Sequence, residues 1–125
     1  MDKFKILQRF REQIIGFLDD LIEQFPDESD MVYLRIFLIE QIPIEMVIEQ
    51  FIEHVLPLKS IIEKRDESFF LERDDIFGIA PRKKIIRFKE LWKSPKLDEK
   101  DRDNIWKYFL IFIKLAALYK KNSET

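Results

Sequence analysis

Carboxylates and a single histidine are the side chains in this sequence whose types suit metal binding or proton transfer. The acidic residues form two groups, Asp19, Asp20 and Glu23 in the first and Asp66, Glu67, Glu72, Asp74 and Asp75 in the second. One or two carboxylates together with a phosphate can bind Mg²⁺, but no glycine-rich phosphate loop accompanies either group. We interpret both groups as solvated loops and helix caps, and we predict no metal site and no cofactor.

His54 and the serines form no recognisable catalytic pair. The sequence has one histidine and no cysteine, which excludes thiol catalysis, disulfides and Cys-ligated zinc. None of the serines has the neighbouring glycines of a nucleophile elbow. We interpret His54 as a structural histidine beside the apolar stripe of a helix, and we predict that the protein is not an enzyme and has no small-molecule substrate.

The best candidate for binding a partner is the segment "PRKKIIRFKELWKSPK", residues 81–96. Its basic residues are Arg82, Lys83, Lys84, Arg87, Lys89, Lys93 and Lys96. A basic helix with interleaved aromatic residues can hold the phosphates of a nucleic acid or lie on an anionic membrane surface. The helical spacing of the apolar residues in the segment favours a third interpretation, a plain amphipathic helix whose charges face water or the acidic half of the chain.

Apolar side chains recur at three- and four-residue steps along most of the sequence, and this spacing predicts helices. The expected helices span residues 4–25, 28–41, 43–55, 58–65, 68–77, 82–93 and 98–121. Asp27 and Asp98 are predicted N-caps, and Gly78 followed by Pro81 is a predicted C-terminal cap. Gly16 lies inside the first helix at a cost of about 1 kcal/mol relative to Ala, which predicts a close helix crossing there. We predict an all-α fold, a single compact bundle of five to seven helices over residues 1–125.

The stretch "MVYLRIFLI", residues 31–39, has eight apolar residues in nine. This is too many for an ordinary surface helix, so the stretch is either a helix buried on most sides or a strand. Acidic residues before it and Pro43 after it favour a helix.

The most apolar stretch is "NIWKYFLIFIKLAALYKK", residues 104–121, which is either a membrane span or the central helix of a core. A spanning helix needs about 20 apolar residues, whereas the run from Ile105 to Tyr119 has 13 in 15. Each of its two lysines, Lys107 and Lys114, would cost about 2.5–3.5 kcal/mol at the middle of a membrane. We predict a central core helix and no membrane span. Both lysines lie on one face, where we expect them to pair with the acidic helix that carries Glu45, Glu49 and Glu53.

The net charge of −2 is the sum of an acidic N-terminal part and a basic C-terminal part. Residues 1–80 carry 9 Lys and Arg against 18 Asp and Glu, a net −9, whereas residues 81–125 carry 13 against 6, a net +7. In a small domain the two parts are expected to attract each other within the fold. The charged N-terminus lacks the apolar run of a signal peptide, so we expect a cytoplasmic protein.

Two segments, 55–72 and 88–109, carry a family resemblance. The residues involved are Arg65, Asp66, Glu67, Phe69, Phe70, Leu91, Trp92, Ile105 and Trp106. In these positions the chain resembles small helical proteins of giant (nucleocytoplasmic large) DNA viruses. The resemblance covers about half of the chain. It implies a viral protein in the host cytoplasm or the virion, and it implies no activity.

Aromatic residues make up 14% of the chain, including twelve phenylalanines. A bundle of this size is not expected to bury all of them, and aromatic patches left at a surface mark protein interfaces. The candidate core or interface aromatics are Phe69, Phe70, Trp92 and Trp106. We therefore predict a non-enzymatic interaction or structural protein that self-associates, for example as a homodimer. The alternative is a nucleic-acid-binding protein that uses the basic helix 82–96.

Overall fold

A computed structural model describes residues 2–72 and 82–123, and over these residues every regular element is helical, which confirms the predicted all-α class. The α-helices are α1 (Lys3–Gln24), α2 (Ser29–Ile36), α3 (Ile44–His54), α4 (Lys59–Glu63), α5 (Glu67–Leu71), α6 (Arg82–Trp92) and α7 (Glu99–Ser123). A π-helical segment, η1 (Phe37–Gln41), continues α2, and a 3₁₀ turn, η2 (Leu56–Leu58), joins α3 to α4. Asp74, Asp75, the predicted Gly78 cap and the end of the predicted helix 68–77 lie outside the described residues.

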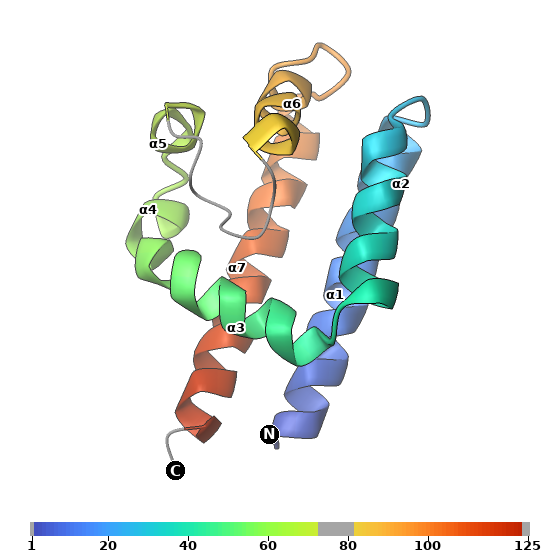
Figure 1. Ribbon diagram of the computed structural model, residues 1–125. Helices are drawn as coiled ribbons and strands as arrows, with labels where there is room; N and C mark the ends of the chain where they lie inside the picture. Colours follow the sequence, from blue (N-terminus) through green and yellow to red (C-terminus); the bar gives the residue numbers. More distant parts are fainter. Residues whose placement is uncertain (1, 73–81, 124–125) are drawn as a thin grey trace.

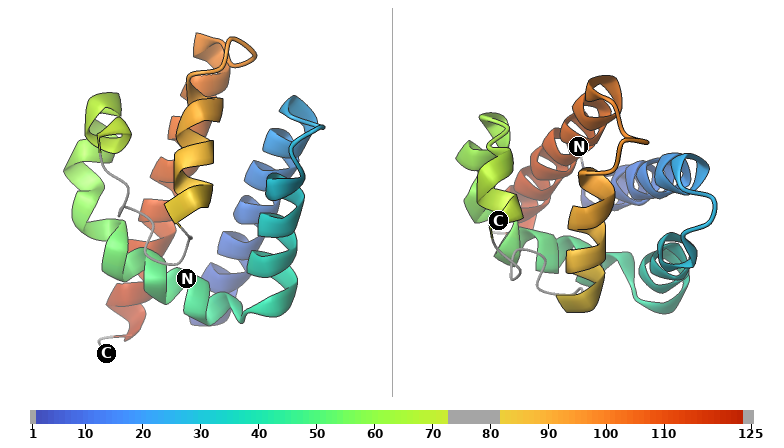
Figure 2. Two further views of the ribbon diagram at one scale, coloured as in Figure 1. Left: turned by 45° about the horizontal axis from the view of Figure 1, so that its top comes forward. Right: turned by 90° about the horizontal axis from the view of Figure 1, so that it is seen from above.

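Two helical hairpins and a helix that crosses them form the architecture (Figure 1). One hairpin pairs α1 with α2, and the other pairs α6 with the first half of α7. α3 runs across the lower part of both and leads into α4 and α5, which lie on the side of α7 away from α2 (Figure 2). α6 therefore lies between α2 on one side and α4 and α5 on the other.

α7 is the central helix, as its apolar run predicted. Buried residues of α7 belong to both clusters of the core, Ile105, Trp106 and Ile113 to one and Phe112, Leu115, Ala116 and Tyr119 to the other. The second cluster joins α7 to the buried stripes of α1 and α3, and the ring of Phe112 lies at its centre. In the part of the chain that the structure describes, no helix has the length and apolar character needed to span a membrane.

The close approach predicted at Gly16 is a contact with Tyr108 of α7. A Cβ atom added at Gly16 would lie 3.3 Å from the Tyr108 hydroxyl oxygen. That hydroxyl donates a hydrogen bond of 2.7 Å to Asp20, one turn further along α1. Burial of the phenol and the neighbouring Asp20 carboxylate raise the pKa of Tyr108 to about 12. A side chain at position 16 would therefore require the Tyr108 hydroxyl to shift by a small amount.

Asp98 caps α7 as predicted, and it does so reciprocally with Asp101. The Asp98 carboxylate accepts from the Asp101 amide at 2.8 Å, and the Asp101 carboxylate accepts from the Asp98 amide at 3.1 Å. These hydrogen bonds satisfy amides that a helix terminus leaves without partners. They also lower the pKa of Asp98.

Three expectations about local structure are wrong. The N-cap of α2 is Glu28 and not Asp27, and the Glu28 side chain makes no capping hydrogen bond because it is bound to Arg87. Residues 31–39 are helical but not buried on most sides, because only one face of the helix meets α1. Lys107 does not pair with the acids of α3, since its Nζ lies 3.0 Å from Asp103 within α7. Lys114 is exposed.

Candidate functional site

The outer face of α2 and η1 is apolar and open to solvent. At helical spacing the residues 31–38 form two faces. Met31, Leu34 and Leu38 form the inner face, which packs on the core. The outer apolar face consists of Val32, Tyr33, Ile36 and Phe37, of which Val32 is 41% exposed, Tyr33 65% and Phe37 40%. An apolar helix face without a covering element is unusual for a small domain, and it is a candidate interface.

Charged residues at the edges of this face are bound to other elements. Arg35 Nε donates to Asp19 of α1 at 2.7 Å, and Lys84 of α6 donates to Asp30 at 2.5 Å. Glu28 accepts from Arg87. All the charged residues in the segment 28–36 are therefore neutralised within the fold. The α2 part of the outer apolar face therefore has no unpaired charge, whereas η1 carries one exposed carboxylate, Glu40.

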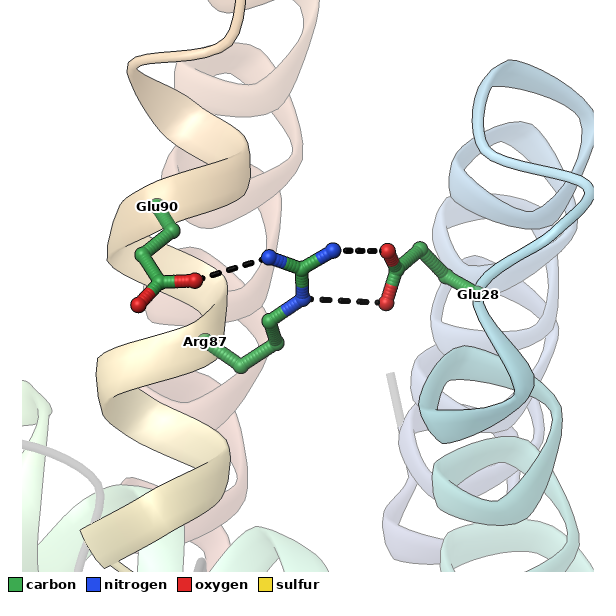
Figure 3. Close-up of polar contacts among 3 residues, drawn as sticks. All are labelled: Glu28, Arg87 and Glu90. Atoms are coloured by element: carbon green, nitrogen blue, oxygen red, sulfur yellow. Dashed lines mark hydrogen bonds and ion pairs between the residues drawn. The ribbon is translucent and has the colours of Figure 1, made fainter.

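Arg87 joins α6 to the start of α2 (Figure 3). Its Nε and Nη2 atoms bind the two carboxylate oxygens of Glu28, and its Nη1 atom lies 2.7 Å from Glu90. The bidentate hydrogen bonds from the Arg87 guanidinium lower the pKa of Glu28. The same two carboxylates raise the pKa of Arg87. Together with the ion pair between Lys84 and Asp30, this contact joins the basic C-terminal part of the chain to the acidic N-terminal part, as expected from their opposite charges.

The predicted basic surface is consequently divided in the structure. Lys84 and Arg87 bind acids of the α1–α2 hairpin, and Lys89 is half-buried. Arg82 and three lysines of the candidate set are exposed, namely Lys83, Lys93 and Lys96. The backbone carbonyl of Lys96 accepts from Gln24 of α1. The seven basic residues thus include two that hold α6 in place and others that face water.

The candidate aromatics Phe69, Phe70, Trp92 and Trp106 are packed together. Trp92 and Trp106 are both buried, with ring centroids 5.6 Å apart, and Phe70 lies 5.7 Å from Trp106. Phe69 is half-buried and contacts Phe70. Arg102 of α7 donates two hydrogen bonds to the Trp92 carbonyl and lies over its ring. These residues form the part of the core that holds the end of α6.

Beneath α6 lies a cavity of about 350 Å³. Its walls come from α1, α2, η1, α3, α6 and α7 and are almost entirely apolar, with Phe17, Phe51, Phe88, Phe109 and Phe112 among them. The polar residues that line it are Asp30, Tyr33, Gln50, His54 and Lys84. Tyr33 and Phe37 belong both to the cavity wall and to the outer apolar face of α2.

The described members of the two acidic groups, together with His54, do not assemble into a metal site. Asp19 and Asp20 bind Arg35 and Tyr108, and Asp66 caps α5 by accepting from the Phe69 amide. Within residues 2–72 and 82–123, no group of three His, Cys, Asp or Glu residues is placed to hold a metal ion. His54 lines the apolar cavity instead.

Sequence reasoning missed both the outer apolar face of α2 and the cavity. The signal for the first was present, because eight apolar residues in nine leave no polar face to point at water. Such a run favours a helix buried on most sides or a strand, whereas only one side of this helix is covered. The cavity had no signal, because its walls come from six elements that are distant in sequence.

Comparisons with protein-family models, curated protein sequences and solved structures gave no match.

Proposed function

We propose that the chain is a non-enzymatic interaction protein that self-associates through the outer apolar face of α2 and η1. The single observation that carries the proposal is the exposure of Val32, Tyr33 and Phe37 on one helix face. Burying such side chains stabilises an interface by about 25 cal/mol for each Å² of apolar surface removed from water.

A second copy of the chain is the partner that fits this face best. In a twofold dimer the same surface meets itself, so any net charge on it would be repelled. Here Asp30 and Arg35, the charges of α2, are bound to Lys84 and Asp19 within the same protomer. The α2 part of the face is therefore apolar and neutral, which makes it compatible with its own copy. Glu40 of η1 is an exposed carboxylate, so the contact is expected to centre on α2. Tyr33 and Phe37 supply the aromatic area that is enriched at the centre of interfaces.

Sedimentation velocity tests this proposal over protein concentrations from about 1 to about 100 µM, where a micromolar dimer dissociates by mass action. The wild-type sedimentation coefficient is expected to rise with concentration. The variant Val32→Lys is expected to remain monomeric, because a twofold interface would bury the added charge twice.

Ile111→Lys is the matched control for this experiment. Ile111 is 38% exposed on α7, close to the exposure of Val32, but it lies outside the outer apolar face of α2. The Ile111→Lys variant should dimerise as the wild type does. A wild-type chain that stays monomeric at the highest concentration contradicts the proposal, as does equal weakening by the two variants.

Nucleic-acid binding by residues 82–96 is the second candidate, favoured by the exposure of Lys83, Lys93 and Lys96. It predicts retention on heparin that falls steeply with salt. Replacing these three lysines by Ala is the appropriate test, because Lys84 and Arg87 also hold α6 against α2. Absence of retention at low salt excludes this candidate.

A further inference from the structure

We propose that the cavity beneath α6 binds a small amphipathic molecule with an apolar body and one neutral hydrogen-bonding head group. This goes beyond self-association, since it assigns a ligand to the interior of the protomer. It also goes beyond the prediction that the chain has no small-molecule substrate, because a ligand that is bound and released unchanged requires no catalytic group.

The size of the cavity suits such a molecule. A cavity of about 150 Å³ lined by Leu, Ile and Phe is large enough to hold benzene, and the cavity here is about 350 Å³. Binding sites for small molecules span about 300–1,000 Å³ and are mostly apolar with a few polar groups. The cavity is open to solvent on one side, because Tyr33 and Phe37 in its wall are 65% and 40% exposed, so a ligand can enter it.

Two polar side chains of α3 specify the head group. Gln50 and His54 lie one helical turn apart, and both line the cavity. Within residues 2–72 and 82–123, neither side chain has a hydrogen-bond partner, although each is only half-exposed. An amide and an imidazole can each donate and accept hydrogen bonds. A hydroxyl or carbonyl group that reached them could replace the water that these half-exposed side chains bind.

Charge in the cavity wall favours a neutral head group over an ionised one. The wall contains one cation, Lys84, and one anion, Asp30, and these bind each other at 2.5 Å. A carboxylate or an ammonium group would therefore enter an apolar site without a free counterion. Burial of an unpaired charge is strongly unfavourable.

The experiment compares 1-octanol, octanoate and octylammonium, which share one chain and differ in the head group. Binding is measured by isothermal titration calorimetry and by the rise in melting temperature that a ligand of the folded state produces. We expect 1-octanol to bind and the two ions to bind about tenfold more weakly or worse. Gln50→Leu should weaken 1-octanol about two- to twelvefold, which corresponds to one neutral hydrogen bond.

Filling the cavity gives an independent test. Leu38 is half-buried and lines the cavity, so Leu38→Trp should occupy the apolar part and weaken 1-octanol by about tenfold or more. Val32→Lys should bind 1-octanol as the wild type does, because Val32 does not line the cavity, and this separates ligand binding from self-association. Lack of any 1-octanol binding overturns the proposal. Equal affinity of wild type, Gln50→Leu and Leu38→Trp also overturns it, because binding would then lie elsewhere.

Discussion

Replacing Phe112 by Ala should cause the largest loss of stability of any single aromatic truncation in the core. Phe112 is 2% exposed, and its ring lies 5.6–5.8 Å from the rings of Phe10, Phe17 and Phe51. Phe→Ala substitutions in cores cost about 3–5 kcal/mol, and the cost rises with the volume left empty. Because Phe112 already borders the 350 Å³ cavity, the new void would join an existing one. We therefore expect about 4–5 kcal/mol, the upper part of that range.

Thermal unfolding followed by circular dichroism measures this loss. For a chain of this length the melting temperature should fall by about 12–25 °C, since each kcal/mol corresponds to roughly 3–5 °C. Phe4→Ala is the matched control, because Phe4 is 75% exposed and its truncation should change stability by about 0.5 kcal/mol or less. If Phe112→Ala does not fold, Phe112→Leu should still show a smaller loss. A loss of less than about 2 kcal/mol for Phe112→Ala, or an equal loss for Phe4→Ala, would refute the placement of Phe112 at the junction of α1, α3 and α7.

Two further predictions concern polar contacts between helices. Gly16→Ala should raise the free energy of unfolding by less than the roughly 1 kcal/mol expected from helix propensity, because the added methyl group meets the Tyr108 hydroxyl. In a Tyr108→Phe background the same substitution should give the full increase. Urea unfolding of the four proteins checks this, and identical gains in both backgrounds would contradict it. The lowered pKa of Glu28 means that its contact with Arg87 stabilises the fold above the ordinary Glu value of about 4.5, and that this contribution is lost as pH falls through the lowered value. Unfolding measured against pH should therefore show a smaller acid-dependent loss in Glu28→Gln than in wild type, and equal slopes would count against the contact.

The central helix could be predicted because its evidence is local. The run from Ile105 to Tyr119 is too short and too interrupted by lysines for a membrane, yet too apolar for a surface. In the same way Gly16 marked a close approach, because glycine inside a helix is unfavourable without such a reason. These inferences needed only the spacing along one helix and general energetic costs.

The candidate sites could not be predicted because they depend on contacts between distant residues. Glu28 and Arg87 are 59 positions apart, so the sequence indicated that opposite charges would attract but not which residues would meet. Residues 31–39 carry apolar side chains all round the helix, so their periodicity does not identify the face that α1 covers. The cavity is a property of how six elements leave space between them.

Single-cysteine cross-linking tests the self-association interface most directly, and the cysteine-free sequence makes it unambiguous. Val32→Cys places a thiol on the outer apolar face of α2, and Ile111→Cys places one at similar exposure on α7. With a short bismaleimide reagent and micromolar protein, we predict a covalent dimer for Val32→Cys and monomer for Ile111→Cys. Equal cross-linking of the two variants, or none in either, would contradict the assignment of α2 as the surface through which two copies meet.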